Sequence, residues 1–165
     1  MANITLITRN FPPLTGGMER LVHQLYLQLV KRHHCNLFGP GGCRDFVEPG
    51  HRVIETEVCP TPLFLILSLL KSVFSHVAGS RPDVVIGGSG LVAPVVVLVA
   101  ILFRAKSIVM IHGLDIVADS RLYQWVFIPF LRRADLIISN SHNTSRLALE
   151  CGVQADRIEI IFPGV

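Results

Sequence analysis

The stretch NITLITRNFPPLTGGME, residues 3–19, passes from the pattern of a strand to that of a loop and then begins a helix. Residues 3–8 are a short run of β-branched and apolar side chains, and the prolines and glycines that follow cannot continue a strand. From Met18 to Val30, apolar residues recur at the i, i+3, i+4 spacing of an amphipathic helix. The stretch therefore predicts a strand, a glycine-containing loop and a helix that packs one face on a sheet.

The same alternation of patterns continues to the end of the chain. Further strands are expected at residues 35–38, 53–58, 83–86, 107–111, 136–138 and 157–162. Helices are expected at 62–77, from Asp119 or Ser120 to Arg133 with a kink at Pro129, and at 141–151 before Gly152, while 91–103 is an apolar segment. This alternation predicts an α/β fold with a doubly wound, mostly parallel, Rossmann-like sheet in a single domain, residues 1–165.

Composition excludes several classes of protein. Half of the residues are apolar and 16% are charged, which excludes a disordered chain. The longest apolar runs, 63–70 and 91–103, are shorter than the roughly 20 residues of a membrane-spanning helix. The formal net charge of +3 is spread without a Lys/Arg block, which argues against a nucleic-acid partner. Because no secretory signal is visible at the N-terminus, we expect a cytoplasmic location, with the inner face of the membrane as an alternative.

The cysteines do not form a recognisable metal motif. Cys35, Cys43, His51 and Cys59 recur every eight residues, whereas the ligands of structural zinc sites usually pair two to four residues apart. We therefore expect reduced thiols and no metal site.

The loops that follow the strands carry the unusual residues of the chain. In a doubly wound sheet, ligands bind beyond the carboxyl ends of the strands, so the loops after Thr8, Ile86, Ile111 and Ile138 should hold the site. Gly16 and Gly17 begin the first helix, where free backbone N–H groups can bind a phosphate. The alternative is that the two glycines only make a tight turn.

The loop after the first strand is not a dinucleotide fingerprint, because it contains no G-x-G-x-x-G. Residues 11–19, FPPLTGGME, resemble instead the opening F-P-P-x-x-G-G-x-E of family 4 of the retaining glycosyltransferases, which have two Rossmann-like domains in the GT-B architecture. Residues 111–115 resemble that family's H-G-x-D loop, and 134–141 resemble its A-D-x-I-I-x-x-S segment. Residues 161–165 are similar to its P-N-G-V stretch, although the asparagine is absent.

The resemblance implies an N-terminal, acceptor-side domain whose donor-binding C-terminal domain lies outside this chain. The implied reaction transfers a sugar from a nucleotide diphosphate sugar, as co-substrate, to an acceptor hydroxyl with retention of configuration, without a metal or another cofactor. A chain of this extent is expected to bind nucleotide weakly and not to turn over. The most informative observation would be the reading frame beyond Val165.

Site residues follow from the resemblance position by position. His112 and Asp115 are implied as catalytic residues, and the residues implied to bind substrate or phosphate are Gly16, Gly17, Glu19, Ser139 and Ser141. Local chemistry offers structural alternatives for several of these residues. His112 suits a hydrogen-bonded structural role, and Asp115 suits a turn. Glu19 suits the positive end of the helix dipole, and Ser141 suits an N-cap.

Two functions of other classes remain open. A non-catalytic binding or membrane-docking module would use the apolar residues 63–74 with Phe64 and Lys71, although a helix buried against the sheet is the preferred interpretation. A serine hydrolase would use Ser89, Asp115 and His142, which occur in the order found in α/β-hydrolases. Residues 87–91, GGSGL, however, lack the final glycine of the G-x-S-x-G nucleophile elbow.

Overall fold

A parallel β-sheet with helices on both faces forms the framework of the protein. The computed structural model describes residues 1–57, 60–113 and 121–163. The strands in this part of the chain are β1 (Asn3–Ile7), β2 (His34–Pro40), β3 (Arg52–Thr56), β4 (Val84–Gly87), β5 (Lys106–Ile111), β6 (Leu136–Ser139) and β7 (Ile158–Ile160). The helices are α1 (Gly17–Val30), α2 (Thr61–Val77), α3 (Ala93–Phe103), α5 (Arg121–Leu131) and α6 (His142–Glu150), with short 3-10 helices η1 (Cys43–Phe46), η2 (Gly90–Val92) and η3 (Ala155–Arg157).

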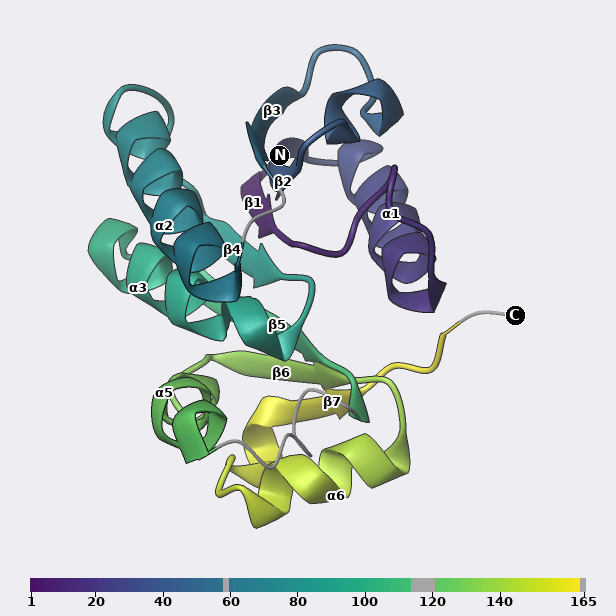
Figure 1. Ribbon diagram of the computed structural model, residues 1–165, viewed down its shortest axis with the longest axis vertical. Helices are drawn as coiled ribbons and strands as arrows, with labels where there is room; N and C mark the ends of the chain where they lie inside the picture. The colour runs from purple at the N-terminus through teal and green to yellow at the C-terminus, as the bar shows by residue number, and fades with distance from the viewer. Residues whose placement is uncertain (58–59, 114–120, 164–165) are drawn as a thin grey trace.

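The strand order is β3-β2-β1-β4-β5-β6-β7, and every neighbouring pair is parallel. The chain runs outward from β1 to β3, returns through α2 to β4 beside β1, and runs outward again in the other direction (Figure 1). The expected doubly wound Rossmann-like sheet is confirmed. In such a sheet the crevice beyond the carboxyl ends of the strands, near the reversal between β1 and β4, is the usual place for a ligand.

The core has two layers because side chains alternate across each strand. Leu6 and Ile86 face the cluster that includes Val22 and Tyr26 of α1. Ile7 and Val85 face the cluster formed by α2, α3 and α5, which lie on the other face of the sheet. α3 is apolar on nearly all sides, and most of its residues are buried, which explains the long apolar run in the sequence.

Most of the expected elements are present with small shifts at their ends, as is usual for boundaries taken from sequence patterns. Residues 91–103 divide into η2 and α3. Pro129 lies inside α5, whereas the expected helix start at Asp119 or Ser120 is outside the described residues. Among the helices that are described, none is both long and apolar enough to cross a membrane.

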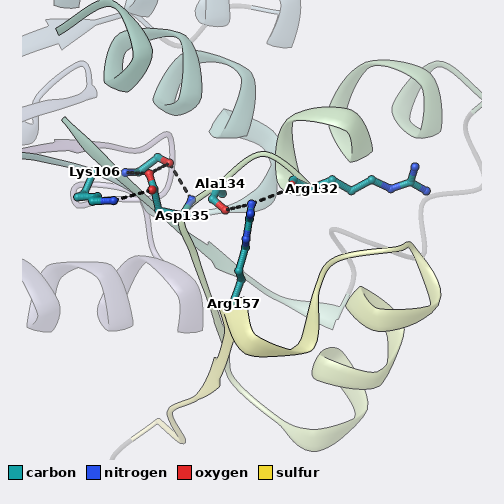
Figure 2. A network of polar contacts seen from close by, with 6 residues as sticks. Lys106, Arg132, Ala134, Asp135 and Arg157 are labelled. Carbon is teal, nitrogen blue, oxygen red and sulfur yellow. Dashed lines mark hydrogen bonds and ion pairs between the residues drawn. The ribbon is translucent and has the colours of Figure 1, made fainter. Parts of the chain in front are cut away.

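Asp135 binds the starts of β5 and β6 to each other. Its Oδ1 accepts a hydrogen bond from Lys106 Nζ at 3.0 Å, and its Oδ2 accepts bonds from the backbone N and Oγ of Ser107 at 2.9 and 2.7 Å (Figure 2). Arg157 Nη1 donates to the carbonyls of Arg132 and Ala134, which holds β7 to the same corner. Burial alone would raise the pKa of Asp135, but the bonds from Ser107 and Lys106 prevail and lower it. The aspartate of residues 134–141 thus has a structural role at the amino edge of the sheet.

Candidate functional site

A groove lies at the carboxyl edge of the sheet, between α1, the ends of β5 and β6, and α6. It has a volume of about 750 Å³ and is lined by Gly17, Met18, Leu21, His112, Gly113, Asn140, Asn143, Leu147 and Pro163. A smaller pocket of about 250 Å³ adjoins it and shares Leu21, His112, Asn140 and Pro163 with it. The loops after β5 and β6 meet the start of α1 at this groove, whereas the loop after Ile86, which was also expected at the site, is not in its lining.

Phe11 anchors the loop that leads into this groove. Its side chain is fully buried, and its ring contacts the rings of His23 and Tyr26 on α1, with centroids 5.1 and 5.7 Å away. Thr8 and Asn10 add hydrogen bonds of 3.0 Å within the same loop. The aromatic residue at the start of FPPLTGGME thus positions the glycines against α1.

Gly16 and Gly17 have different surroundings. Gly16 is the extended N-cap of α1, and a Cβ on it would overlap the carboxylate of Glu19. Asn10 Nδ2 holds that carboxylate through a 2.9 Å hydrogen bond to Oε1. Gly17 is exposed, lines the groove, and has no atom within 4 Å of the place where a Cβ would lie.

Glu19 therefore places its own negative charge at the positive end of α1. This geometry agrees with the structural alternative for Glu19, which is to interact with the helix dipole. The open side of the helix terminus is then at Gly17. A phosphate at this terminus would have to approach from the side of Gly17, because Glu19 lies against Gly16.

His112 lies at the end of β5, where it is buried and lines both the groove and the smaller pocket. Its Nε2 is 3.2 Å from Gly88 O, and since a carbonyl oxygen can only accept, Nε2 carries the proton and donates. This bond fixes the orientation of the ring. The structural interpretation of His112 thus has direct support, and the same geometry leaves the ring at the wall of the groove.

Gly88 was not predicted as a site residue, although its backbone hydrogen bonds connect the ends of β1, β4 and β5. Its N–H donates to Ile7 O at 3.0 Å, and its carbonyl accepts from His112. A Cβ at this position would lie 2.5 Å from Thr8 Oγ1 and 3.2 Å from Val22 Cγ1. The close packing of the β1 and β4 loops therefore requires a glycine here.

Polar side chains at the start of α6 form the opposite wall. Ser141 Oγ accepts a 3.1 Å bond from Thr144 N, which confirms Ser141 as the N-cap. Thr144 Oγ1 donates to Asn140 Oδ1 at 2.9 Å, which orients the Asn140 carboxamide. Asn143, which the sequence analysis did not select, lines the groove from the first turn of the helix.

The remaining predicted site residues lie elsewhere. Ser139 is fully buried, its Oγ donates to Glu159 O at 3.4 Å, and it does not line the groove. Asp115 is outside the described residues. No Lys, Arg, Asp or Glu is among the residues that line the groove or the smaller pocket in the described part of the chain.

The chemistry of a metal site or of a hydrolase finds little support here. Within residues 1–57, 60–113 and 121–163, no three His, Cys, Asp or Glu side chains are grouped so as to hold a metal ion. Burial raises the pKa of the Cys35 thiol to about 12, so it stays protonated. Ser89 is only 1% exposed and its Oγ has no hydrogen-bond partner among the described residues, whereas a nucleophilic serine must be presented at an open turn.

Comparison with known proteins supports the assignment made from the sequence. The profile of the family described as Glycosyltransferase Family 4 matches residues 15–165. No curated protein matches the chain.

Solved structures with the same fold are all distant in sequence. HepE of Anabaena, in complex with UDP and glucose, is 17% identical with a TM-score of 0.73, and the match covers 100% of this chain and 45% of that one. Sucrose-phosphate synthase of Thermosynechococcus elongatus is 18% identical with a TM-score of 0.74, over 100% of this chain and 49% of that one. MurG of Acinetobacter baumannii is 13% identical with a TM-score of 0.66, over 100% and 46%. The chain thus spans about half the length of these structures.

Proposed function

The chain belongs to glycosyltransferase family 4, and we propose that it is the acceptor-side half of a retaining enzyme that acts on a nucleotide diphosphate sugar. In the proposed reaction, the bond between the anomeric carbon and the diphosphate breaks, and its electron pair leaves with the diphosphate. The acceptor hydroxyl oxygen forms the new glycosidic bond, and its proton passes to the departing diphosphate. A cytoplasmic location is part of this proposal, since nucleotide sugars are the co-substrates.

The groove at the carboxyl edge is the observation that carries the proposal. It brings together the open end of α1 at Gly17, the imidazole of His112 and the carboxamides of Asn140 and Asn143. Carboxamides both donate and accept hydrogen bonds, so they match the hydroxyl groups of a sugar. Leu21 and Leu147 supply apolar surface for the less polar faces of such a ligand.

The lack of charge in the described groove lining favours a second domain that binds the diphosphate. The described lining has no cationic side chain that could neutralise a diphosphate. The backbone amides at the start of α1 offer only the partial positive charge of a helix terminus. We propose that a donor-binding domain supplies the remaining contacts, in keeping with structural neighbours that are about twice as long.

Four of the predicted site residues have a proposed role within this scheme. His112, held by Gly88, contacts the transferred sugar, and Gly17 faces the departing diphosphate. Asp115 orients His112 or binds acceptor hydroxyls. Ser141 acts through the helix start that it caps.

Amide NMR spectra of the 165-residue chain test this site. On addition of UDP-glucose, or separately of octyl glucoside as an acceptor-like probe, we expect the largest shifts at the backbone amides of Gly17, Gly113, Asn140 and Asn143. Replacing the exposed Asn143→Ala should weaken binding about threefold or more, as expected for the loss of one hydrogen bond. The matched control is Gln154→Ala, an exposed carboxamide far from the groove lining.

Two outcomes would contradict the proposal. One is a set of shifts that leaves these four amides unchanged while others move. The other is equal weakening by Asn143→Ala and Gln154→Ala, which would mean that the loss is not specific to the groove.

A further inference from the structure

Helix α2 covers the sheet, yet it exposes a row of large apolar side chains to solvent, and most of its fully buried residues are polar. The side buried against the sheet and α3 consists of Phe64, Ser68, Ser72, Ser75 and His76. The side exposed to solvent consists of Leu63, Ile66, Leu70, Phe74 and Val77. These exposed residues follow the i, i+3, i+4 spacing, so they form one continuous stripe along the helix.

The helix packs on the sheet, as the preferred interpretation of residues 62–77 expected. Phe64, Leu65 and Leu69 pack in the core, and the other fully buried residues of the helix are polar. Phe64, which only the alternative of a membrane-docking module placed at a membrane, is buried. The Nζ of Lys71 donates to the carbonyl of Glu55 instead of extending into solvent.

The exposed apolar stripe continues onto the two neighbouring helices. α3 packs beside α2 (Figure 1), and α5 packs beside α3. Exposed residues on these two helices are Leu98, Ile101, Leu102, Trp125 and Val126. We refer to these residues and the stripe of α2 together as the apolar face. Phe74 is 71% exposed, Ile101 65% and Trp125 83%.

Exposure of this kind is concentrated on this side of the molecule. The outward residues of α1 are mainly polar, among them Arg20, Gln24 and Gln28. Scattered exposed apolar residues are ordinary, whereas a contiguous apolar patch on adjoining helices marks a surface that binds a protein or a membrane.

The charged residues around the apolar face indicate which kind of partner binds it. α2, α3 and α5 contain no Asp or Glu. Arg81 and Arg104 are exposed beside the ends of α2 and α3, where they line a pocket of about 330 Å³ with Val77, Leu102 and Phe103. In the described part of the chain neither arginine forms an ion pair. Three acidic residues lie near this side of the molecule. Asp135 pairs with Lys106, Asp83 accepts a bond from Asn3 N, and Glu55, beside Leu70 and Phe74, accepts a bond from Arg44 N.

We propose that the apolar face docks on the surface of an anionic lipid bilayer. Phe74, Ile101 and Trp125 enter the boundary between headgroups and acyl chains, and Arg81 and Arg104 bind lipid phosphates. A second copy of the chain fits this surface less well, because it would present the same arginines and the same three helices without Asp or Glu. None of the apolar face residues lines the groove, so docking leaves the groove accessible.

Trp125 makes the proposal directly measurable because it is the single tryptophan of the sequence. The protein is mixed with vesicles of phosphatidylcholine alone, or of phosphatidylcholine with phosphatidylglycerol, and both sedimentation and tryptophan emission are recorded. We expect co-sedimentation and a shift of the emission to shorter wavelength with the anionic vesicles, and much weaker binding to the neutral ones.

Variants assign the binding to this surface. The double variant Phe74→Ser/Ile101→Ser should weaken binding by about tenfold or more, from the apolar area that it withdraws from the bilayer. Arg81→Gln/Arg104→Gln should weaken binding to anionic vesicles by about fivefold for each arginine. The matched control is Phe46→Ser on η1, which is 40% exposed and whose ring contacts His23 of α1, on the opposite face of the sheet. Unchanged circular dichroism shows that each variant is folded.

Several results would overturn the proposal. These are absence of binding to the anionic vesicles, equal binding to neutral ones, or equal loss in Phe46→Ser. A dimer that forms without vesicles and is dissociated by Phe74→Ser/Ile101→Ser would show that a second copy covers the face instead.

Discussion

Single residues at the edge of the groove act mainly by holding the backbone in place. Gly16 allows the carboxylate of Glu19 to lie against the helix terminus, and Gly88 allows the β4 loop to approach Thr8. Ser141 fixes the start of α6, which places Asn143 in the groove. The chemistry proposed for the site therefore depends on residues that do not themselves touch a ligand.

The cap at Ser141 gives a prediction at this scale. Replacing Ser141→Ala removes the acceptor of the Thr144 N–H, so the free energy of unfolding should fall by about 1 kcal/mol. The control Ser145→Ala, four residues further in the same helix, should leave stability unchanged or slightly higher because alanine favours helix interiors. Urea unfolding followed by circular dichroism measures both, and equal losses in the two variants would contradict the capping role.

At the scale of elements, α2 is held to the sheet by polar contacts in addition to the apolar packing of Phe64, Leu65 and Leu69. His76 Nδ1 donates to Ser80 O at 3.0 Å, since that carbonyl can only accept. The neutral ring then accepts at Nε2 from Thr5 Oγ1 of β1, 2.9 Å away. Burial, together with the positive charge of Arg52, lowers the pKa of His76 below 6.5 although the bond to Ser80 acts in the opposite direction.

His76 should therefore make stability depend on pH. Because its pKa is lower in the folded state, the unfolded chain binds a proton first as the pH falls through 6.5, and stability decreases until the folded pKa is reached. In His76→Gln this part of the decrease should be absent, and the variant should be less stable than the original protein at pH 7. Urea unfolding across the pH series measures both effects, and identical pH profiles for the two proteins would contradict this account.

At the scale of the whole molecule, the doubly wound sheet brings the helix start at Gly17 and the ends of β5 and β6 to one edge. The apolar face lies instead on the helices that cover one side of the sheet. The groove and the proposed docking surface are thus separate parts of the molecule, so variants of one can be tested without altering the other.

The neutral groove also leads to a prediction for the isolated chain. Since the described lining offers no cation for a diphosphate, the 165-residue protein should bind nucleotide sugar weakly and should not transfer sugar repeatedly. A radiolabelled sugar-transfer assay measures this, with folding verified by circular dichroism so that inactivity is not due to unfolding. Steady transfer by the isolated chain would show that no second domain is needed.

Much of the framework was predictable from local patterns. The alternation of strand and helix periods predicted the class of fold and nearly every element, and FPPLTGGME indicated the family that the profile match confirms. Ser141 as an N-cap also followed from its position before a helix. These features depend on residues a few positions apart, so the sequence determines them directly.

Other features depended on the tertiary structure. Asn143 and Leu147 joined His112 in the groove only once β5 and β6 were neighbours. The periodicity of residues 62–77 predicted a helix correctly but not which side faced solvent, because apolar and small polar residues alternate around it. Which face is buried depends on what packs against the helix, and that is decided by the order of strands far apart in the chain.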